Sequence, residues 1–155
     1  MRAVVQRVTG GAGIGGASVC SGGRVASQIG HGLLVYLGVG TEDTEAEADY
    51  LADKVRHLRI FPEGDKHLNR DVLDVGGQVL VVSAFTVQAD ARKGRRPSLD
   101  QAAPPERARE LYEYFCDVLA GLGVPVERGV FRAEMAVASV NDGPVCILLD
   151  SYKAF

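Results

Sequence analysis

Apolar and polar residues recur along the chain with two different periods, which predict strands and helices respectively. The first eight residues, MRAVVQRV, have a period of two and predict a strand, and the segments 32–39 and 78–85 are continuous apolar runs short enough for buried strands. Residues 17–20 and 24–29 flank a Ser-Gly-Gly turn, which predicts a hairpin. Further strands are predicted within the segments 124–131, 133–140 and 144–150.

Two segments have the three- and four-residue spacing of amphipathic helices. The first follows Thr44 and Glu47, which have the spacing of a capping box, and its apolar residues from Ala48 to Leu58 form one stripe. The second begins at Pro104-Pro105, because proline suits the first turn of a helix, and it is expected to end near Gly123. Its apolar stripe comprises Ala108, Leu111, Tyr112, Phe115 and Leu119.

About seven strands and two helices without βαβ alternation predict an α+β domain with a curved, mixed or antiparallel sheet. No linker divides the chain, so we expect residues 1–155 to form a single domain. Two segments are expected to be irregular: the glycine-rich loop 9–16 and the long link 59–77, which has room for a short helical turn. Asn141-Asp142-Gly143 predicts a hairpin turn between the last two strands, and Pro144 then enters a strand without an N–H group to donate.

Composition narrows the possible classes of protein. The chain has 155 residues, 46% hydrophobic and 24% charged, which suits one globular domain. A net charge of −3 gives no general attraction to nucleic acid, so any RNA contact must come from a local patch. No apolar run reaches the roughly 18 residues of a transmembrane helix, and no secretory signal is visible. The three cysteines, an odd number without CxxC spacing, predict neither a disulfide framework nor a zinc site and fit a cytoplasmic protein.

Two patterns that suggest a cofactor are better explained without one. Residues 11–16 match the G-x-G-x-x-G pattern of dinucleotide-binding loops. However, turn glycines follow instead of a helical stripe, and the acidic ribose ligand expected about 20 residues later is missing. The histidines His31, His57 and His67 form no metal-binding pattern. We therefore interpret 11–16 as part of a flexible loop and expect neither a metal nor an organic cofactor.

Polar and basic residues cluster after the apolar run 78–85. Ser83 and Thr86 could place hydroxyl groups at the edge of a sheet, although such residues commonly serve only as hydrogen-bonding groups at strand ends. A run of cations in the next loop is either a solvated surface or a phosphate-binding patch. A polyanionic substrate with its reactive end near Thr86 would account for both features. The four cations are Arg92, Lys93, Arg95 and Arg96.

Taken together, seven motifs resemble the D-aminoacyl-tRNA deacylase family. In chain order they are MRAVVQRV, GLLVYLGV, LRIF, VLVVSAFT, ARKGRRPS, AAPPERARELYEYF and NDGPV, and the resemblance runs from Met1 to about Asp150. It implies a β-barrel-like fold and a homodimer. It also implies a hydrolase that releases D-amino acids, and glycine, from tRNA without a cofactor. The implied partners are therefore aminoacylated tRNA and a second copy of the chain.

Two family signatures, SQFTL and NxGPVT, correspond to residues 83–87 and 141–146. The resemblance implies that the first lines the catalytic pocket, where backbone groups of Phe85 and Thr86 position the substrate. It further implies that a cis Gly143-Pro144 pair enters the active site of the other subunit and excludes L side chains. The catalytic segment is then Ser83, Ala84, Phe85 and Thr86, and the residues that support the Gly-Pro pair are Arg7 and Asn141.

The chain departs from these signatures at two positions. Ala84 replaces the usual Gln, which removes a side-chain amide, and Cys146 replaces the usual Thr, which exchanges a hydroxyl for a weaker donor. Three alternatives therefore stay open: an editing deacylase for a mischarged L-aminoacyl-tRNA, a catalytically silent tRNA-binding protein, and a β-rich dimer without an RNA role. A trans or withdrawn Gly143-Pro144 would favour the first, and tRNA binding without ester cleavage would favour the second.

Overall fold

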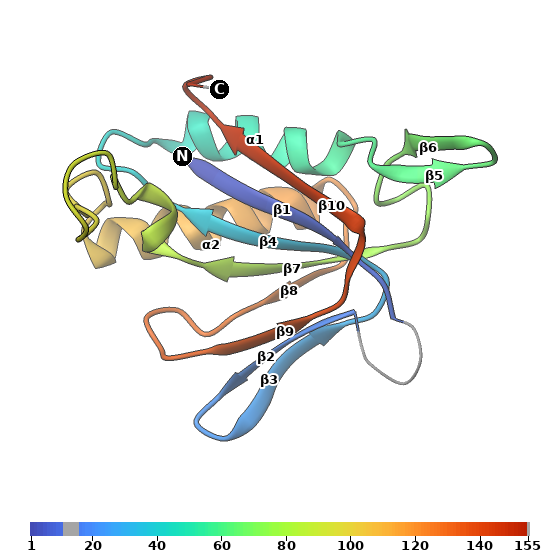
Figure 1. Ribbon diagram of the computed structural model, residues 1–155, viewed down its shortest axis with the longest axis horizontal. Coiled ribbons are helices and arrows are strands. Elements are labelled where there is room, and N and C mark those ends of the chain that lie inside the picture. Colours follow the sequence, from blue (N-terminus) through green and yellow to red (C-terminus); the bar gives the residue numbers. More distant parts are fainter. Residues whose placement is uncertain (11–15, 155) are drawn as a thin grey trace.

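The computed structural model describes residues 1–10 and 16–154, which contain ten strands, two α-helices and one short 3₁₀-helix (Figure 1). The helices are α1 (Glu45–His57), η1 (Phe85–Gln88) and α2 (Pro105–Gly121). The strands are β1 (Arg2–Val8), β2 (Ala17–Ser21), β3 (Arg24–Ile29), β4 (Gly32–Gly38), β5 (Phe61–Glu63), β6 (Lys66–Arg70), β7 (Gln78–Ser83), β8 (Val126–Arg128), β9 (Ala136–Ser139) and β10 (Asn141–Asp150). Apart from Gly16, the glycine motif at 11–16 lies outside the described residues.

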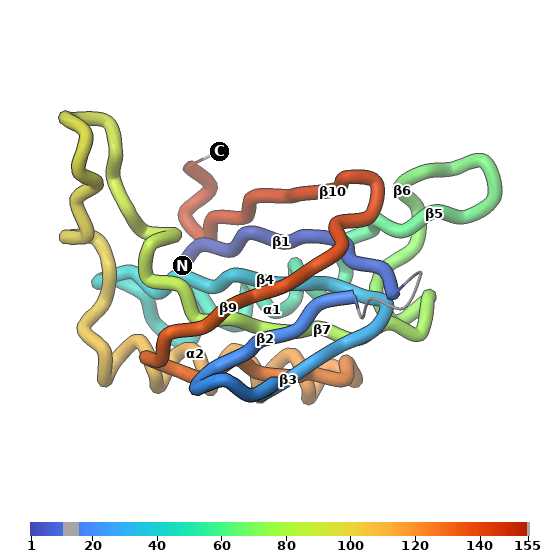
Figure 2. Tube along the Cα trace, turned by 60° about the horizontal axis from the view of Figure 1, so that its bottom comes forward, coloured from blue at the N-terminus to red at the C-terminus, as the bar shows by residue number. Residues whose placement is uncertain are grey.

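Five strands form a mixed sheet in the order β10-β1-β4-β7-β8. β1 pairs antiparallel with β10 and with β4, whereas β4 pairs parallel with β7, and β7 with β8. A second sheet has the order β3-β2-β9, and β5 and β6 form a hairpin that projects from one end of the molecule (Figures 1 and 2). The predicted α+β class, with a mixed sheet and two main helices, is confirmed. No strand pairing in the described part of the chain closes a sheet into a barrel.

Both faces of the central strands are buried. In β4, Leu33, Val35 and Leu37 belong to the core under α1 and α2, while Leu34 packs in a second core beneath β2, β3 and β9. Figure 2 shows the two helices on one side of the five-stranded sheet and β2, β3 and β9 on the other. A strand covered on both faces has no solvent-facing positions, which explains the continuous apolar runs at 32–39 and 78–85. Burying each Leu or Val contributes about 1.5–3 kcal/mol.

The two predicted helices begin and end as the sequence indicates. The capping box of α1 is formed, since the Thr44 hydroxyl accepts from the Ala46 N–H and the Thr44 N–H donates to Glu47 Oε2 at 2.8 Å. α2 has Pro105 in its first turn, where no hydrogen bond is lost. Gly123, with φ of +89°, follows the end of α2. Both predictions of helix position are confirmed.

Three details of the predicted topology are wrong. The link 59–77 contains the β5–β6 hairpin, whose residues are mostly exposed and so carry no apolar alternation that would reveal strands. β9 and β10 do not form a hairpin, because β9 pairs with β2 and β10 with β1, so the chain crosses between sheets at Val140. Helical connections between parallel strands also exist, since β4–α1–β7 and β7–α2–β8 are both crossovers.

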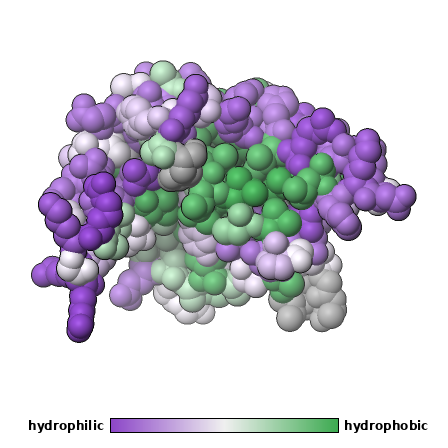
Figure 3. Space-filling model, turned by 45° about the horizontal axis from the view of Figure 1, so that its top comes forward, coloured by the Kyte–Doolittle hydropathy of each residue, from purple (hydrophilic) through white to green (hydrophobic). Residues whose placement is uncertain are grey.

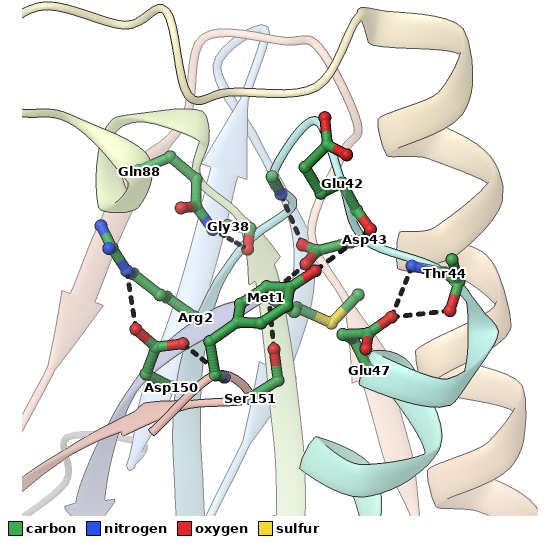
Figure 4. Close-up of polar contacts among 12 residues, drawn as sticks. Met1, Arg2, Gly38, Glu42, Asp43, Thr44, Glu47, Gln88, Asp150 and Ser151 are labelled. Atoms are coloured by element: carbon green, nitrogen blue, oxygen red, sulfur yellow. Dashed lines mark hydrogen bonds and ion pairs between the residues drawn. The ribbon is translucent and has the colours of Figure 1, made fainter. Parts of the chain in front are cut away.

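The N-terminal amino group helps to hold together the elements near the β10 edge of the five-stranded sheet (Figure 4). The Met1 ammonium is fully buried, where it forms an ion pair with Asp43 and donates to Ser151 Oγ at 2.7 Å. Asp43 also accepts from the Gly40 N–H at 2.5 Å, and Arg2 is paired with Asp150 at 3.2 Å. These contacts connect the start of β1, the end of β10 and the loop after β4. None of the described helices is long and apolar enough to span a membrane.

Candidate active site

An apolar pocket lies at the end of the five-stranded sheet where the parallel strands β4, β7 and β8 finish. Because parallel strands end on the same side of a sheet, the loops that follow them converge there. The pocket has a volume of about 450 Å³. Its walls come from the residues after β4, from the β7–η1 connection, from the start of α2 and from the loop after β8. The lining residues are Val39, Ser83, Phe85, Ala102, Ala103, Pro105, Ala108, Phe131, Arg132, Ala133, Glu134 and Met135.

Of the segment Ser83–Thr86, Ser83 and Phe85 line this pocket, whereas Ala84 and Thr86 are not among its lining residues. Ser83 ends β7, and the Ala84 N–H donates to Leu37 O at 2.9 Å, which fixes the start of η1 against β4. The first N–H groups of a helical turn have no partner within the turn. Among the described residues, no hydrogen bond outside regular helices and strands uses the N–H of Phe85 or Thr86. These two backbone donors are therefore available to a carbonyl oxygen or an oxyanion.

Two buried residues that sequence reasoning did not single out hold η1 in position. Gln88 Nε2 donates to Gly38 O at 2.6 Å, and both residues are buried. A Cβ atom on Gly38 would lie 2.9 Å from the Val87 Cβ and 3.1 Å from the Ala84 carbonyl oxygen. Only glycine allows this close approach of η1 to the end of β4. In the sequence, the only sign of this close packing is that Gly38 ends a strongly apolar strand.

Aromatic residues make the pocket suited to a flat, uncharged group. Phe85 is 59% exposed, so its ring is accessible from the solvent at the pocket rim. On the opposite wall, Phe131 packs against Tyr112, with ring centroids 5.8 Å apart. An exposed aromatic ring beside an apolar pocket, here that of Phe85, favours the stacking of a nucleobase or another planar ring.

Glu134 is the one carboxylate among the residues that line the pocket, and no hydrogen bond in the described part of the chain connects its side chain to η1. The Thr86 hydroxyl has no hydrogen bond to a histidine or a carboxylate among these residues. His31 stacks edge-on against Phe61, and His57 contacts Asp53 on α1. The described residues also contain no cluster of three or more His, Cys, Asp or Glu that could hold a metal ion. The geometry at η1 therefore favours catalysis by backbone donors and positioning over a side-chain nucleophile.

The basic loop, defined here as residues 90–98, follows η1 and rises beside the pocket end of the molecule (Figure 2). Its base is closed by two backbone hydrogen bonds of 2.8 Å between Asp90 and Ser98. Arg92 is bound to Asp90, with Nη2 2.6 Å from Oδ2, and this hydrogen bonding lowers the pKa of Asp90 to about 2. Lys93, Arg95 and Arg96 are exposed and form no ion pair among the described residues. Three of the four predicted cations are thus free to bind an anion.

The Gly143–Pro144 pair lies near the start of β10. Its peptide bond is cis, as the resemblance implies, and both residues are exposed. Gly143 has φ of +119°, and a Cβ atom there would lie 2.9 Å from Nη2 of Arg7. The turn therefore requires glycine, because both the backbone conformation and the space exclude a side chain.

Three polar groups support this turn from beneath. Arg7 is 8% exposed and donates to Ile60 O at 2.6 Å. Its Nε lies 3.0 Å from Asp142 Oδ2, an ion pair whose angles fall short of a hydrogen bond. Asn141 Oδ1 accepts from the Val145 N–H at 3.0 Å and so bridges the Gly-Pro pair. Arg7 and Asn141 thus lie where a supporting role requires them, and Asp142 joins them.

One chain does not bring the Gly-Pro pair and the pocket together. Asn141 pairs with Val8, which pairs with Gly32 at the start of β4, whereas the pocket lies beyond the end of β4. The seven residues of β4 separate the two sites by roughly 20 Å. The two predicted halves of the active site are therefore at opposite ends of the same sheet.

The outward face of β10 and β1 carries exposed apolar residues between polar ones. The register pairs Val4 with Leu148 and Gln6 with Cys146, and Leu148 is 57% exposed. Figure 3, in which the top of the view in Figure 1 is turned toward the reader, shows a continuous apolar area flanked by hydrophilic residues. β10 lies on this side of the molecule. Apolar areas of this kind commonly mark protein interfaces. Cys146, a free thiol, is exposed on the same side of β10.

Comparisons with known proteins agree with this geometry. A family model described as D-Tyr-tRNA(Tyr) deacylase matches residues 4–150. D-aminoacyl-tRNA deacylases of Koribacter versatilis and Desulfitobacterium hafniense are 56% and 53% identical over 155 residues, covering 100% of this chain and of each relative. A solved structure of a c-Myc DNA Unwinding Element Binding Protein has a TM-score of 0.89 and 39% identity, covering 97% of this chain and 98% of the other. A structure of a probable eukaryotic D-amino acid tRNA deacylase shares the fold, with a TM-score of 0.79, 16% identity and coverage of 96% and 97%.

Proposed function

Because the chain belongs to the D-Tyr-tRNA(Tyr) deacylase family, we propose that it hydrolyses the ester bond of D-aminoacyl-tRNA. The products are a free D-amino acid and tRNA. The full-length match to D-aminoacyl-tRNA deacylases carries this proposal, and the pocket with its two free backbone donors supports it.

The part of the substrate that enters the pocket is the terminal adenosine, which is the same in every tRNA. D-amino acids differ in their side chains, whereas every tRNA ends in the same adenosine. The apolar pocket between Phe85 and Phe131 suits that base, which would leave the ester at the η1 rim. The exposed cations of the basic loop then face the tRNA backbone, which makes binding dependent on salt.

The chemistry requires little from the protein beyond positioning. Water attacks the ester carbonyl carbon, and the carbonyl oxygen becomes an oxyanion that accepts hydrogen bonds from the N–H groups of Phe85 and Thr86. When the intermediate collapses, the ribose oxygen leaves with a proton from the neighbouring ribose hydroxyl, which in turn takes the proton that the attacking water loses. Ala84 is compatible with this scheme because its backbone, not its side chain, holds η1 against Leu37.

Discrimination against L-amino acids comes from a second copy of the chain. In a homodimer that buries the apolar face of β10 and β1, the exposed Gly143–Pro144 pair reaches the partner's pocket end. Its carbonyl groups fill the space where an L side chain would project, so rejection depends on steric exclusion. Glycine has no side chain to exclude, and glycyl-tRNA is therefore also a substrate. The location of the protein in the cytoplasm stays a prediction from cysteine usage.

Hydrolysis of D-tyrosyl-tRNA and L-tyrosyl-tRNA by the purified protein, measured side by side, tests this function. We expect loss of the D ester with the L ester spared. Loss of both esters would contradict the Gly-Pro filter and favour an editing enzyme of different specificity. Loss of neither, despite tRNA binding, would contradict the enzyme itself and favour a silent tRNA-binding protein.

A further inference from the structure

We infer that Arg109 and Arg132 form a second phosphate-binding site, which holds the single-stranded 3′ end of tRNA on the side of the pocket formed by Phe131. This inference rests on the proposed function and adds to it a substrate contact that the family signatures do not contain. The basic loop is a separate cationic element, which begins four residues after Thr86 on the η1 side of the pocket.

Arg132 has a backbone conformation that argues for a specific role of its side chain. It is the third residue of the turn Val130–Ala133, which is closed by a hydrogen bond of 3.3 Å from the Ala133 N–H to Val130 O. Its φ of +60° is typical of glycine or asparagine at that position of a turn. Strained backbone of this kind gathers at binding sites. Arg132 is exposed and lines the pocket wall beside Phe131.

Arg109 lies against the same aromatic ring. It projects from α2 with its guanidinium carbon 4.9 Å from the centroid of Phe131, and it is exposed. Neither Arg109 nor Arg132 forms an ion pair in the described part of the chain, whereas the neighbouring Arg107 is bound to Glu110. Arg109 thus lies over the Phe131 ring and Arg132 lines the pocket next to Phe131 in the chain, which places two unneutralised guanidinium groups where the phosphate of a bound nucleotide can reach them.

One acidic residue acts against an anion at this site. Glu134 lines the same pocket and is exposed, so its carboxylate would repel a phosphate bound at Arg132. Removing the charge of Glu134 should therefore strengthen tRNA binding, whereas removing an arginine should weaken it. We expect Glu134→Gln to tighten tRNA binding by about twofold, because screening limits the effect at an exposed site.

The experiment compares two RNAs: intact deacylated tRNA and the same tRNA without its last three nucleotides. Arg132→Gly and Arg109→Gln should each weaken the binding of intact tRNA by about fivefold and make its salt dependence shallower by about 0.7 in log–log slope. On the trimmed tRNA both variants should bind like the unmodified protein. Lys54→Gln is the matched control, because Lys54 is also a helical cation above an aromatic ring, 5.5 Å from Tyr50 on α1.

Glycine relieves the positive φ, so Arg132→Gly should melt within about 3 °C of the parent protein. Arg132→Asn, which also tolerates this conformation, repeats the test if the glycine variant melts lower. Unchanged affinity for intact tRNA, or an equal loss on both RNAs, would overturn the inference. These outcomes are separate from the proposed function, which fails only if the parent protein leaves D-tyrosyl-tRNA intact.

Discussion

The two ends of the five-stranded sheet are built in different ways. At the end of β4 and β7, η1 is held by tight packing on Gly38 and by the buried side chain of Gln88. At the start of β10, the Gly143–Pro144 pair is exposed and is supported by polar groups beneath it. The first end forms a pocket, and the second presents an exposed Gly-Pro pair.

This difference has a consequence for how the enzyme works. A pocket that must hold a constant group benefits from rigid packing, whereas a pair that must enter another molecule's pocket has to be exposed and yet fixed. The polar support of Arg7 and Asn141 meets the second requirement without covering the pair. Because about 20 Å separates the two ends in one chain, the proposed site would take its two halves from two copies of the chain.

The largest effect should follow from disturbing the packed end. In Gly38→Val the added side chain would collide with Val87 and the Ala84 carbonyl and displace η1. We expect about a 100-fold loss of deacylation rate, since small misplacements of catalytic groups are costly, and about 1–3 kcal/mol less stability from overpacking. Gly121→Val, where an added Cβ meets nothing within 4 Å, is the control. A Gly38→Val enzyme with full activity would contradict the role of η1.

Removing the free cations of the basic loop should reduce the affinity for tRNA, by a smaller factor than the loss of rate expected for Gly38→Val. Replacing Lys93, Arg95 and Arg96 together by serine should weaken tRNA binding by about 30-fold and make its salt dependence shallower. Arg92→Ser should change affinity by less than about twofold, because the charge of Arg92 is already paired with that of Asp90. Filter binding at several salt concentrations measures both effects. A loss of affinity from Arg92→Ser as large as that of the triple variant would show that the Arg92–Asp90 ion pair does not matter for binding.

At the exposed end, Asp142→Asn should loosen the Gly-Pro turn by removing the ion pair with Arg7. The ratio of D-tyrosyl to L-tyrosyl hydrolysis should fall by about tenfold, with a loss of about 1 kcal/mol in stability because Asp142 is partly exposed. Asp117→Asn breaks another Asp–Arg pair, with Arg128, and should leave the ratio unchanged. An unaltered ratio in both variants would mean that Asp142 does not hold the turn.

The smallest effect is expected at Thr86. Its hydroxyl has no hydrogen bond to a base among the described residues, so Thr86→Ala should keep the deacylation rate within about threefold of the parent. Single-turnover hydrolysis of D-tyrosyl-tRNA measures this directly. Loss of nearly all activity would instead identify Thr86 as the nucleophile and overturn the backbone-donor scheme.

Sequence patterns predicted the elements that have strong local signals. The capping box at Thr44 and the buried runs of β4 and β7 were readable because each follows one periodicity or one cap. The β5–β6 hairpin was missed because its exposed residues carry no apolar pattern. The hairpin expected at Asn141–Gly143 was wrong because local turn chemistry cannot tell which sheet a strand will join.

The candidate site shows the same limit. The signature residues Ser83–Thr86 and Gly143–Pro144 were recognised from the resemblance, but their separation depends on strand order, which no local motif contains. Gly38 and Gln88 were missed because a glycine or a glutamine becomes informative only when its neighbours in space are known. The pairing of Arg92 with Asp90 is likewise a property of loop geometry.

Mixing two inactive variants tests whether the site is shared between copies. Ala102→Trp fills the pocket, and Pro144→Trp enlarges the exposed pair so that it blocks the partner's pocket. Light scattering first verifies that each variant is a dimer, and native mass spectrometry verifies that the mixture contains mixed dimers. A mixed dimer then has one site with both halves intact. We predict that each variant alone leaves D-tyrosyl-tRNA intact, and that the mixture regains about a quarter of the parental activity with the L ester still spared. A mixture as inactive as its components would contradict a site built from two chains.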